Sequence, residues 1–190
     1  MESILLQAMK HQTIVSIYTN AMDPNSFSTG YVLGITDEWV LINSISPGGI
    51  NDGIYLLPLE DIYQINIEGA YENKIKCLHQ LKKQINLPSM QQDNLLLGIL
   101  MFAKNNNALI TCEIYRENEV YGFVEDIDKD TVFLKCYDCY GRFVSHSTLK
   151  AESITRAKCC SEYEISLKML LLDSETKNCD SHYIFHGKST

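Results

Sequence analysis

Two stretches of similar pattern decide the fold expected for this chain. Residues 30–42 read GYVLGITDEWVLI, and residues 122–134 read GFVEDIDKDTVFL. Each stretch begins with a glycine in a run of strand-forming residues, passes through an acidic turn and ends in an apolar run of strand length. The pattern predicts two consecutive β-strands joined by a short turn, and it occurs twice.

The similarity extends beyond these stretches at a constant shift of 92 residues, from position 30 to position 122. No gap is needed as far as the pairs Gly49 and Gly141 or, further on, the aromatic-acid pairs 71–72 and 163–164. Agreement of glycines, apolar positions and an aromatic-acid pair over about fifty residues indicates an internal duplication. We therefore expect two domains, at 1–88 and 89–174, followed by a polar C-terminal tail at 175–190.

Upstream of the two glycines the shift changes. The dipeptide 17–18 matches the dipeptide 114–115, both reading Ile-Tyr, at a shift of 97 residues from position 17 to position 114. The first copy is therefore expected to carry about five extra residues in a surface loop at 20–29.

Each copy is expected to contain a short helix, five strands and a closing helix. The opening helices are expected at 4–9 and 95–103, and the closing helices carry apolar residues at helical spacing, the first as far as Ile85, before Pro88 ends the segment. The expected strands of the first copy are 13–18, 30–35, 39–44, 53–57 and 62–67, and those of the second are 109–115, 122–127, 131–136, 142–147 and 154–158.

Composition and charge restrict the class of protein. The chain has 190 residues, of which 45% are hydrophobic, and a formal net charge of −8. This apolar content predicts a globular protein and excludes a disordered chain. The acidic balance opposes sequence-independent attraction to nucleic-acid backbones and to anionic membranes.

The cysteines and the apolar runs indicate a compartment. Seven cysteines is an odd number, and the N-terminus lacks the pattern of a secretory signal, so reduced thiols in the cytoplasm are expected. The longest apolar stretch, 95–103, is about half of the roughly 20 residues that span a bilayer, so no membrane partner is expected.

Two groups of residues carry a weak metal signal. Cys136 and Cys139 have the spacing of half a zinc site, and the vicinal pair 159–160 would add two thiolates in a geometry that is poor for zinc. The tail holds Cys179, His182 and His186, for which an incidental occurrence on a mobile terminus is the simpler interpretation. We therefore predict no metal and no cofactor.

The order of elements and the repeated 13-residue pattern resemble the Sm-like family, the small SH3-type barrels of Sm and LSm proteins and of the bacterial RNA chaperone Hfq. The stretches 30–42 and 122–134 resemble the family's first motif, and 57–62 and 149–154 resemble the second in their closing isoleucine. The resemblance implies a mainly β fold with flanking helices (α+β), made of two tandem Sm-like five-stranded barrels.

The resemblance also implies where an RNA site would lie. Sm-like proteins stack a base on an aromatic before the third strand and use basic or polar residues before the fifth. These places hold Glu38 and Asp130 in the turn, and Glu60 and Glu152 before the fifth strand. Carboxylates repel phosphate, so the RNA-binding residues of the family are not carried over.

Catalytic constellations are missing from the sequence. There is no phosphate-binding glycine loop, nucleophile elbow or helical metal motif. The acidic pairs 37–38, 60–61 and 125–126 are interpreted as solvated turns or strand edges. His146 falls at the place of Ile54 in the first copy, so the copies do not share it. We therefore predict that the protein is not an enzyme.

The leading hypothesis is a cytosolic interaction or regulatory module that binds a protein partner or associates with itself. The candidate contact residues are aromatic residues and an arginine, which dominate interface hot spots: Trp39, Tyr137, Tyr140 and Arg142. For Trp39 and Tyr137 a place in the core is the alternative. The alternative function is RNA binding through a different, basic face, made of Lys129, Lys135, Arg142 and Arg156.

Overall fold

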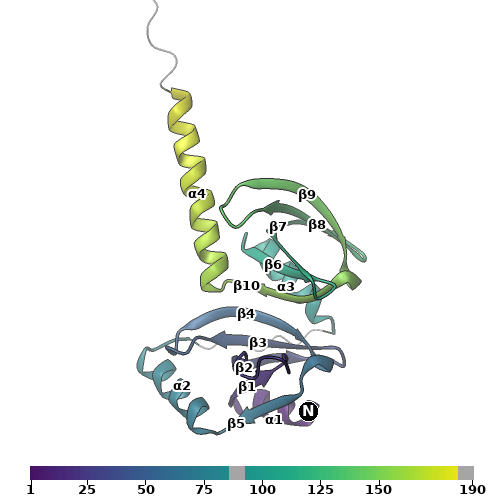
Figure 1. Ribbon diagram of the computed structural model, residues 1–190, viewed down its shortest axis with the longest axis vertical. Helices are drawn as coiled ribbons and strands as arrows, with labels where there is room; N and C mark the ends of the chain where they lie inside the picture. The colour runs from purple at the N-terminus through teal and green to yellow at the C-terminus, as the bar shows by residue number, and fades with distance from the viewer. Residues whose placement is uncertain (86–92, 184–190) are drawn as a thin grey trace, which may run out of the picture.

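The computed structural model describes the backbone of residues 1–85 and 93–183 and the side chains of these residues as far as 173. Within these ranges ten strands form one antiparallel sheet, flanked by helices (Figure 1). The helices are α1 (Glu2–His11), α2 (Ala70–Leu81), α3 (Leu95–Asn105) and α4 (Glu162–Tyr183). The strands are β1 (Ile14–Tyr18), β2 (Ser28–Ile35), β3 (Trp39–Ile45), β4 (Asn51–Pro58), β5 (Gln64–Ile67), β6 (Leu109–Ile114), β7 (Asn118–Asp128), β8 (Thr131–Tyr137), β9 (Phe143–Lys150) and β10 (Ile154–Cys159).

The sheet has the strand order β5-β1-β2-β3-β4-β10-β6-β7-β8-β9. Its first half (β1–β5) and its second half (β6–β10) therefore have the same order, with the last strand of each half beside the first. The halves meet where β4 pairs with β10, and β5 and β9 lie at the two ends of the sheet. The chain is thus mainly β with flanking helices, and the expected order of elements is confirmed.

From the second strand of each half onward, the strand register keeps the shift of 92 residues. Leu41 stands opposite Leu56 in the pairing of β3 with β4, and Phe133 stands opposite Thr148 in the pairing of β8 with β9. Irregularities fall at matching places too, because the register of β2 slips between Val32 and Gly34 and that of β7 slips between Val124 and Asp126. Positions in the two halves can therefore be compared strand by strand.

The first strand of each half departs from the sequence-based expectation. Val15 stands opposite Gly30, and Ile110 stands opposite Gly122. This register gives a shift of 95 residues, from 15 to 110, so the expected shift of 97 is wrong. The paired Ile-Tyr dipeptides match in sequence but not in register. The loop after the first strand is longer by three residues in the first half, which is the difference between shifts of 95 and 92.

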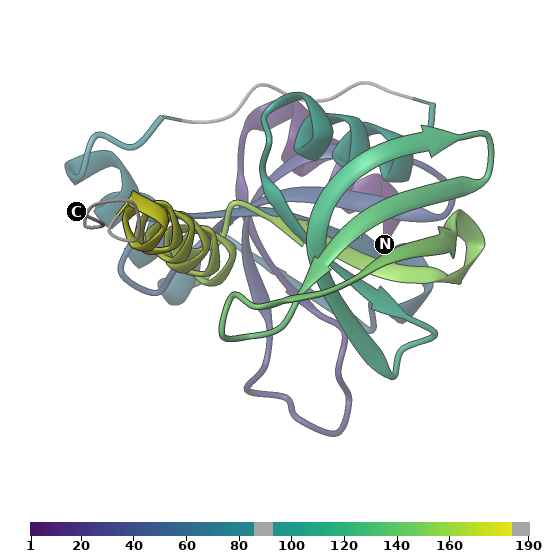
Figure 2. The same cartoon turned by 90° about the horizontal axis from the view of Figure 1, so that it is seen from above.

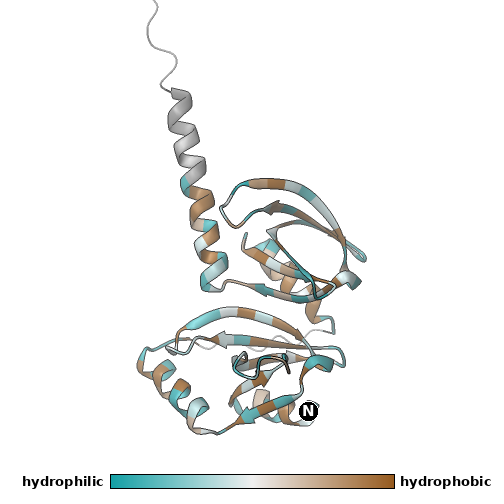
Figure 3. Ribbon diagram, viewed as in Figure 1, coloured by the Kyte–Doolittle hydropathy of each residue, from teal (hydrophilic) through white to brown (hydrophobic). Residues whose placement is uncertain are grey.

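The helices lie on two flanks of the sheet. Figures 1 and 2 show α2 and α4 on one flank and α1 and α3 on the other. α3 lies against β6, β7 and β10 of its own half and also against β3 and β4 of the first half. It is among the most hydrophobic segments of the chain in Figure 3. α3 therefore covers the junction between the halves.

The hydrophobic core is divided in the same way. One cluster lies within the first half and is covered by α1; it includes Leu5, Ala8, Val15, Val40 and Ile42. The largest cluster combines residues of both halves with α3. Its members include Leu33, Leu41, Ile54, Leu56, Leu96, Ile99, Leu134 and Cys159. The outer side of β2, β3 and β4 thus contributes to the core of the junction.

The closing helices are fixed by buried glutamates. Glu72 is the third residue of α2, and its carboxylate accepts a hydrogen bond from the Ser16 hydroxyl of β1. Glu164 is the third residue of α4 and accepts a bond of 2.7 Å from the Thr111 hydroxyl of β6. Glu164 also accepts the backbone N–H of Ser161, as in a capping box. The acid of each aromatic-acid pair therefore joins a helix to the first strand.

The closing helices differ from expectation in length. α2 ends at Leu81, and Ile85 lies exposed beyond it, because the backbone turns at Lys83 with a positive φ of 51°. Pro88 lies outside the described residues. α4 continues to Tyr183, into the segment expected to be a polar tail, and the side chains from 174 onward and residue His186 lie outside the described part. Among the described helices, none combines the length and the apolar content needed to span a membrane.

Candidate interaction surfaces

At the junction of the two halves, an edge strand of each half is paired with an edge strand of the other. β4 and β10 run antiparallel, with Leu56 opposite Ala157 and Ile54 opposite Cys159. Ile54 and Leu56 alternate along β4, so their side chains leave the same face of the strand. Both are buried in the cluster that includes α3. The junction therefore shows how one half of this protein binds the edge strand of the other half.

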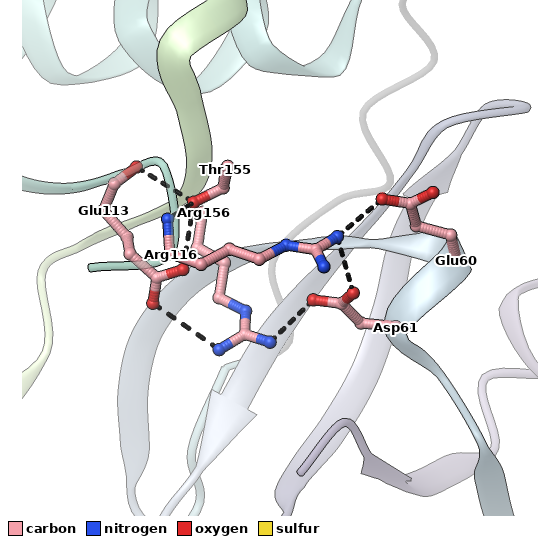
Figure 4. Close-up of polar contacts among 6 residues, drawn as sticks. All are labelled: Glu60, Asp61, Glu113, Arg116, Thr155 and Arg156. Atoms are coloured by element: carbon pink, nitrogen blue, oxygen red, sulfur yellow. Dashed lines mark hydrogen bonds and ion pairs between the residues drawn. The ribbon is translucent and has the colours of Figure 1, made fainter. Parts of the chain in front are cut away.

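An ion-pair network flanks this strand pair (Figure 4). Asp61, in the turn before β5, accepts from Arg116 at 2.9 Å and from Arg156 at 2.8 Å. Arg116 also pairs with Glu60 at 2.6 Å, and Arg156 pairs with Glu113 at 3.5 Å. The carboxylates of Glu60 and Asp61 belong to the first half and both arginines to the second, so the network fastens the halves to each other.

Exposure separates the two carboxylates of the turn. The side chain of Asp61 is 12% exposed and that of Glu60 is 77% exposed. A partly buried ion pair with several donors depends strongly on each partner, whereas an exposed pair contributes little. The expectation that the pair 60–61 forms a solvated turn is wrong for Asp61. Its partners lie far along the chain, so no local pattern indicated them.

The predicted partner-binding residues lie in different environments. Tyr137 is buried against Leu109 and Leu167, so it occupies the place in the core that is its alternative interpretation. Trp39 is half-buried at the start of β3 and packs against the core of the junction. Tyr140 is exposed in the turn between β8 and β9, where the Arg142 guanidinium lies 5.1 Å from the centre of its ring.

The predicted basic face is not brought together. Lys129 lies in the turn before β8 and Arg142 in the turn after it, at opposite ends of that strand. Arg142 pairs with Asp138 at 2.7 Å, and the Lys135 ammonium lies 5.7 Å from the ring centre of Tyr137. Arg156 belongs to the junction network. These four cations therefore form no continuous stripe for a phosphate backbone.

Two of the four carboxylates predicted to oppose RNA line one cavity, whereas Glu60 belongs to the junction network. A cavity of about 800 Å³ opens beside Trp39, and its lining includes Glu38 from the first half and Glu152 from the second. Asp37 and Asp93 line it as well, and none of the described residues in its lining is a lysine or an arginine. The cavity is acidic, which disfavours a nucleic-acid ligand there.

The cysteines do not form a metal centre in the described part of the chain. Cys136 is buried and Cys139 is exposed in the next turn. No group of three or more metal-ligating side chains occurs among the described residues. Burial raises the pKa of Cys112 to about 12. A hydrogen bond with Cys159 lowers the pKa of Cys160 to about 7.

The outer faces of the two halves differ in polarity at matching register positions. On the first half, Leu33, Ile54 and Leu56 are buried against the second half and α3, and we call them the β2–β4 face. The same places on the second half hold three polar, exposed residues, which we call the β7–β9 face: Glu125, His146 and Thr148. His146 Nδ1 and Glu125 Oε2 lie 2.8 Å apart. The face at the outer end of the second half is therefore polar.

At the opposite end of the sheet, beside β5, exposed positions are apolar where the matching positions of the second half are buried. The shift of 95 residues also holds for the opening helices, because the backbone hydrogen bond from Thr13 to Ala8 matches the one from Ala108 to Ala103. Ile4 on α1 therefore corresponds to Ile99 on α3. Ile99 is fully buried at the junction, whereas Ile4 is 38% exposed.

The fifth strands show the same difference in burial. Cys159 on β10 is fully buried, and Ile67, at its place on β5, is 45% exposed. We call Met1, Ile4 and Ile67 the α1–β5 surface. It exposes apolar residues at the positions that the second half buries in the junction.

Comparison with protein-family models, with curated proteins and with solved structures found no match to this chain.

Proposed function

We propose that this chain is a cytosolic, non-enzymatic interaction module built from two tandem Sm-like five-stranded barrels, and that it binds a protein partner through a free end of its sheet. The observation that carries the proposal is the junction itself. There β4 and β10 pair edge to edge, α3 covers the apolar contact, and β5 and β9 remain at the ends. Exposed sheet edges are templates for a further strand.

Two features support the barrels and their origin by duplication. Both halves have the strand order with the fifth strand beside the first. In both, the second strand carries a glycine at the crossing with the third strand and a register slip after it, at Gly30 in the first half and Gly122 in the second. A glycine and a bulge both let a strand bend sharply, as a small barrel requires.

The side chains around His146 favour a binding role over catalysis. His146 contacts Glu125 on one face of β9. Ser145 and Ser147, its neighbours in sequence, bond to one another at 3.0 Å, and alternate residues of a strand point to opposite faces. The histidine and the hydroxyls therefore do not form a nucleophile and base pair.

The proposal is tested by affinity purification of the full chain from an extract of its native cells at low salt, with both protein and nucleic acid assayed in the recovered material. We expect a protein recovered in fixed ratio to the chain and no enrichment of RNA. Recovery of RNA without protein would support the alternative function. Recovery of neither would contradict an interaction role.

A further inference from the structure

The second half has a surface that matches the α1–β5 surface, and the junction shows what covers it. On the second half, Leu96 and Ile99 of α3 and Cys159 of β10 are buried against the aliphatic side chains of β4. β4 supplies an antiparallel edge strand whose Ile54 and Leu56 face them. On the first half the matching positions are exposed. The missing component is therefore an edge strand with aliphatic side chains at alternate positions.

A second copy of the chain does not supply this strand. Its β9 would offer His146 and Thr148 where β4 offers Ile54 and Leu56. Docking would bury the contact between His146 and Glu125, which now lies partly in water. Taking charged or strongly polar groups out of water without new partners is costly.

The network that fastens the junction is also missing from such a contact. At matching register positions, Asp61 of the first half corresponds to Ser153 of the second half. Likewise, Arg156 of the second half corresponds to Gln64 of the first half. A contact of β9 with β5 of another copy would thus bring Ser153 near Gln64, without the ion pairs that Asp61 and Arg156 form. The first half's own β2–β4 face is already buried.

We propose that the α1–β5 surface binds an edge strand of a different protein, one that presents aliphatic side chains at alternate positions as β4 does. This inference rests on the proposed function and specifies its surface and partner. The strand pairs antiparallel with β5, and its aliphatic side chains contact Ile67 and, beneath α1, Ile4. The polar β7–β9 face keeps copies of the chain from occupying the same surface.

The test replaces the polar side chains of the β7–β9 face with the apolar side chains found on the β2–β4 face. The triple variant E125L/H146I/T148L places the residues of the β2–β4 face on the β7–β9 face. We expect wild type to be a monomer by light scattering, and the triple variant to rise with concentration to at least about twice that mass through head-to-tail contacts. Adding I67K or I4K to the triple variant is expected to restore the monomer.

The matched control is L6K in the same background. Leu6 is 41% exposed on the same helix, and Met101, at its place on α3, is 39% exposed, so neither belongs to the junction. The triple variant with L6K is expected to assemble. Assembly that persists with I67K would be unspecific and would overturn the proposal, as would a triple variant that stays monomeric, or a wild type that assembles by itself.

A cross-link confirms the register in variants that circular dichroism shows to be folded. Lys158 stands opposite Tyr55 at the junction, which corresponds to Asn66 opposite Ser147 between copies. N66C and S147C in the triple background are expected to give an intermolecular disulfide between peptides 66 and 147, found by mass spectrometry. Its absence in an assembled variant would overturn the proposed strand pairing. Failure of the wild-type chain to recover a protein would instead contradict the proposed function.

Discussion

Thr111 donates its hydroxyl to the buried carboxylate of Glu164 at 2.7 Å, and this bond joins α4 to the first strand of the second half. Ser16 and Glu72 make the matching contact in the first half. A carboxylate that also accepts the N–H of Ser161 has its bonds inside the fold and few to water. Each closing helix is therefore held by a polar contact beneath an apolar stripe.

Replacing Glu164 with glutamine should destabilise the protein. The amide keeps the shape but turns one accepting oxygen into a donor, which faces the hydroxyl or N–H groups that the carboxylate now accepts. We expect a loss of about 1–3 kcal/mol in the free energy of unfolding, measured in urea. E162Q, at an exposed position of the same helical turn, is the control and should change stability by less than about 0.5 kcal/mol. Equal effects of the two changes would contradict the role of Glu164.

Asp61 and Glu60 should differ sharply although they are neighbours. D61N leaves Arg116 and Arg156 without their shared carboxylate, and we expect a loss of about 2–4 kcal/mol in unfolding free energy. E60Q removes an exposed pair and should cost less than about 0.5 kcal/mol. The comparison is made by thermal and urea unfolding at low and high salt. A D61N protein as stable as E60Q would show that the network does not fasten the junction.

The sequence predicted the order of elements because that order depends on local patterns. The glycine, acidic turn and apolar run at 30–42 and 122–134 each indicate strands without reference to the rest of the chain, and these strands are observed as β2, β3, β7 and β8. For the first strand, the matching Ile-Tyr dipeptides favour a shift of 97 residues. Only the strand register, in which Val15 stands opposite Gly30 and Ile110 opposite Gly122, gives the correct shift of 95.

The junction could not be predicted, because it depends on contacts between distant segments. Asp61 follows Glu60 in a short acidic turn, and only its contacts with Arg116 and Arg156 make it a partly buried anchor. The alignment of the two copies indicates part of the polarity of the β7–β9 face, because it places His146 where the first copy has Ile54. Its meaning required the burial of Ile54 against the second half.

Gly30 should tolerate no side chain. A Cβ at this position would lie 1.9 Å from the backbone oxygen of Asn43, so the crossing of β2 with β3 would have to open. We expect G30A to lower the unfolding free energy by about 1–3 kcal/mol or more. G48A is the control, because the nearest atoms to a Cβ at Gly48 are flexible side-chain ends at 3.7 Å. If G30A unfolds at the same urea concentration as G48A, the close crossing is not required.

Cys160 should react with iodoacetamide at a lower pH than an ordinary thiol. The hydrogen bond with Cys159 stabilises the thiolate and lowers the pKa of Cys160 to about 7, so its reactive form increases as the pH rises through that value. C159A removes the donor, and the midpoint of alkylation should then rise toward the ordinary thiol value of 9.0. Peptide mass spectrometry separates Cys160 from the other cysteines. An unchanged midpoint in C159A would exclude this cause.

Affinity purification with a set of variants tests most directly whether this chain is an interaction module that acts through the α1–β5 surface. Wild type, I4K, I67K and L6K are used as full-length baits in native cell extract, and the recovered proteins are quantified. We predict that wild type and L6K recover the same protein in fixed ratio, and that I4K and I67K lose it. Recovery of no protein by wild type, or equal recovery by all four baits, would contradict this role.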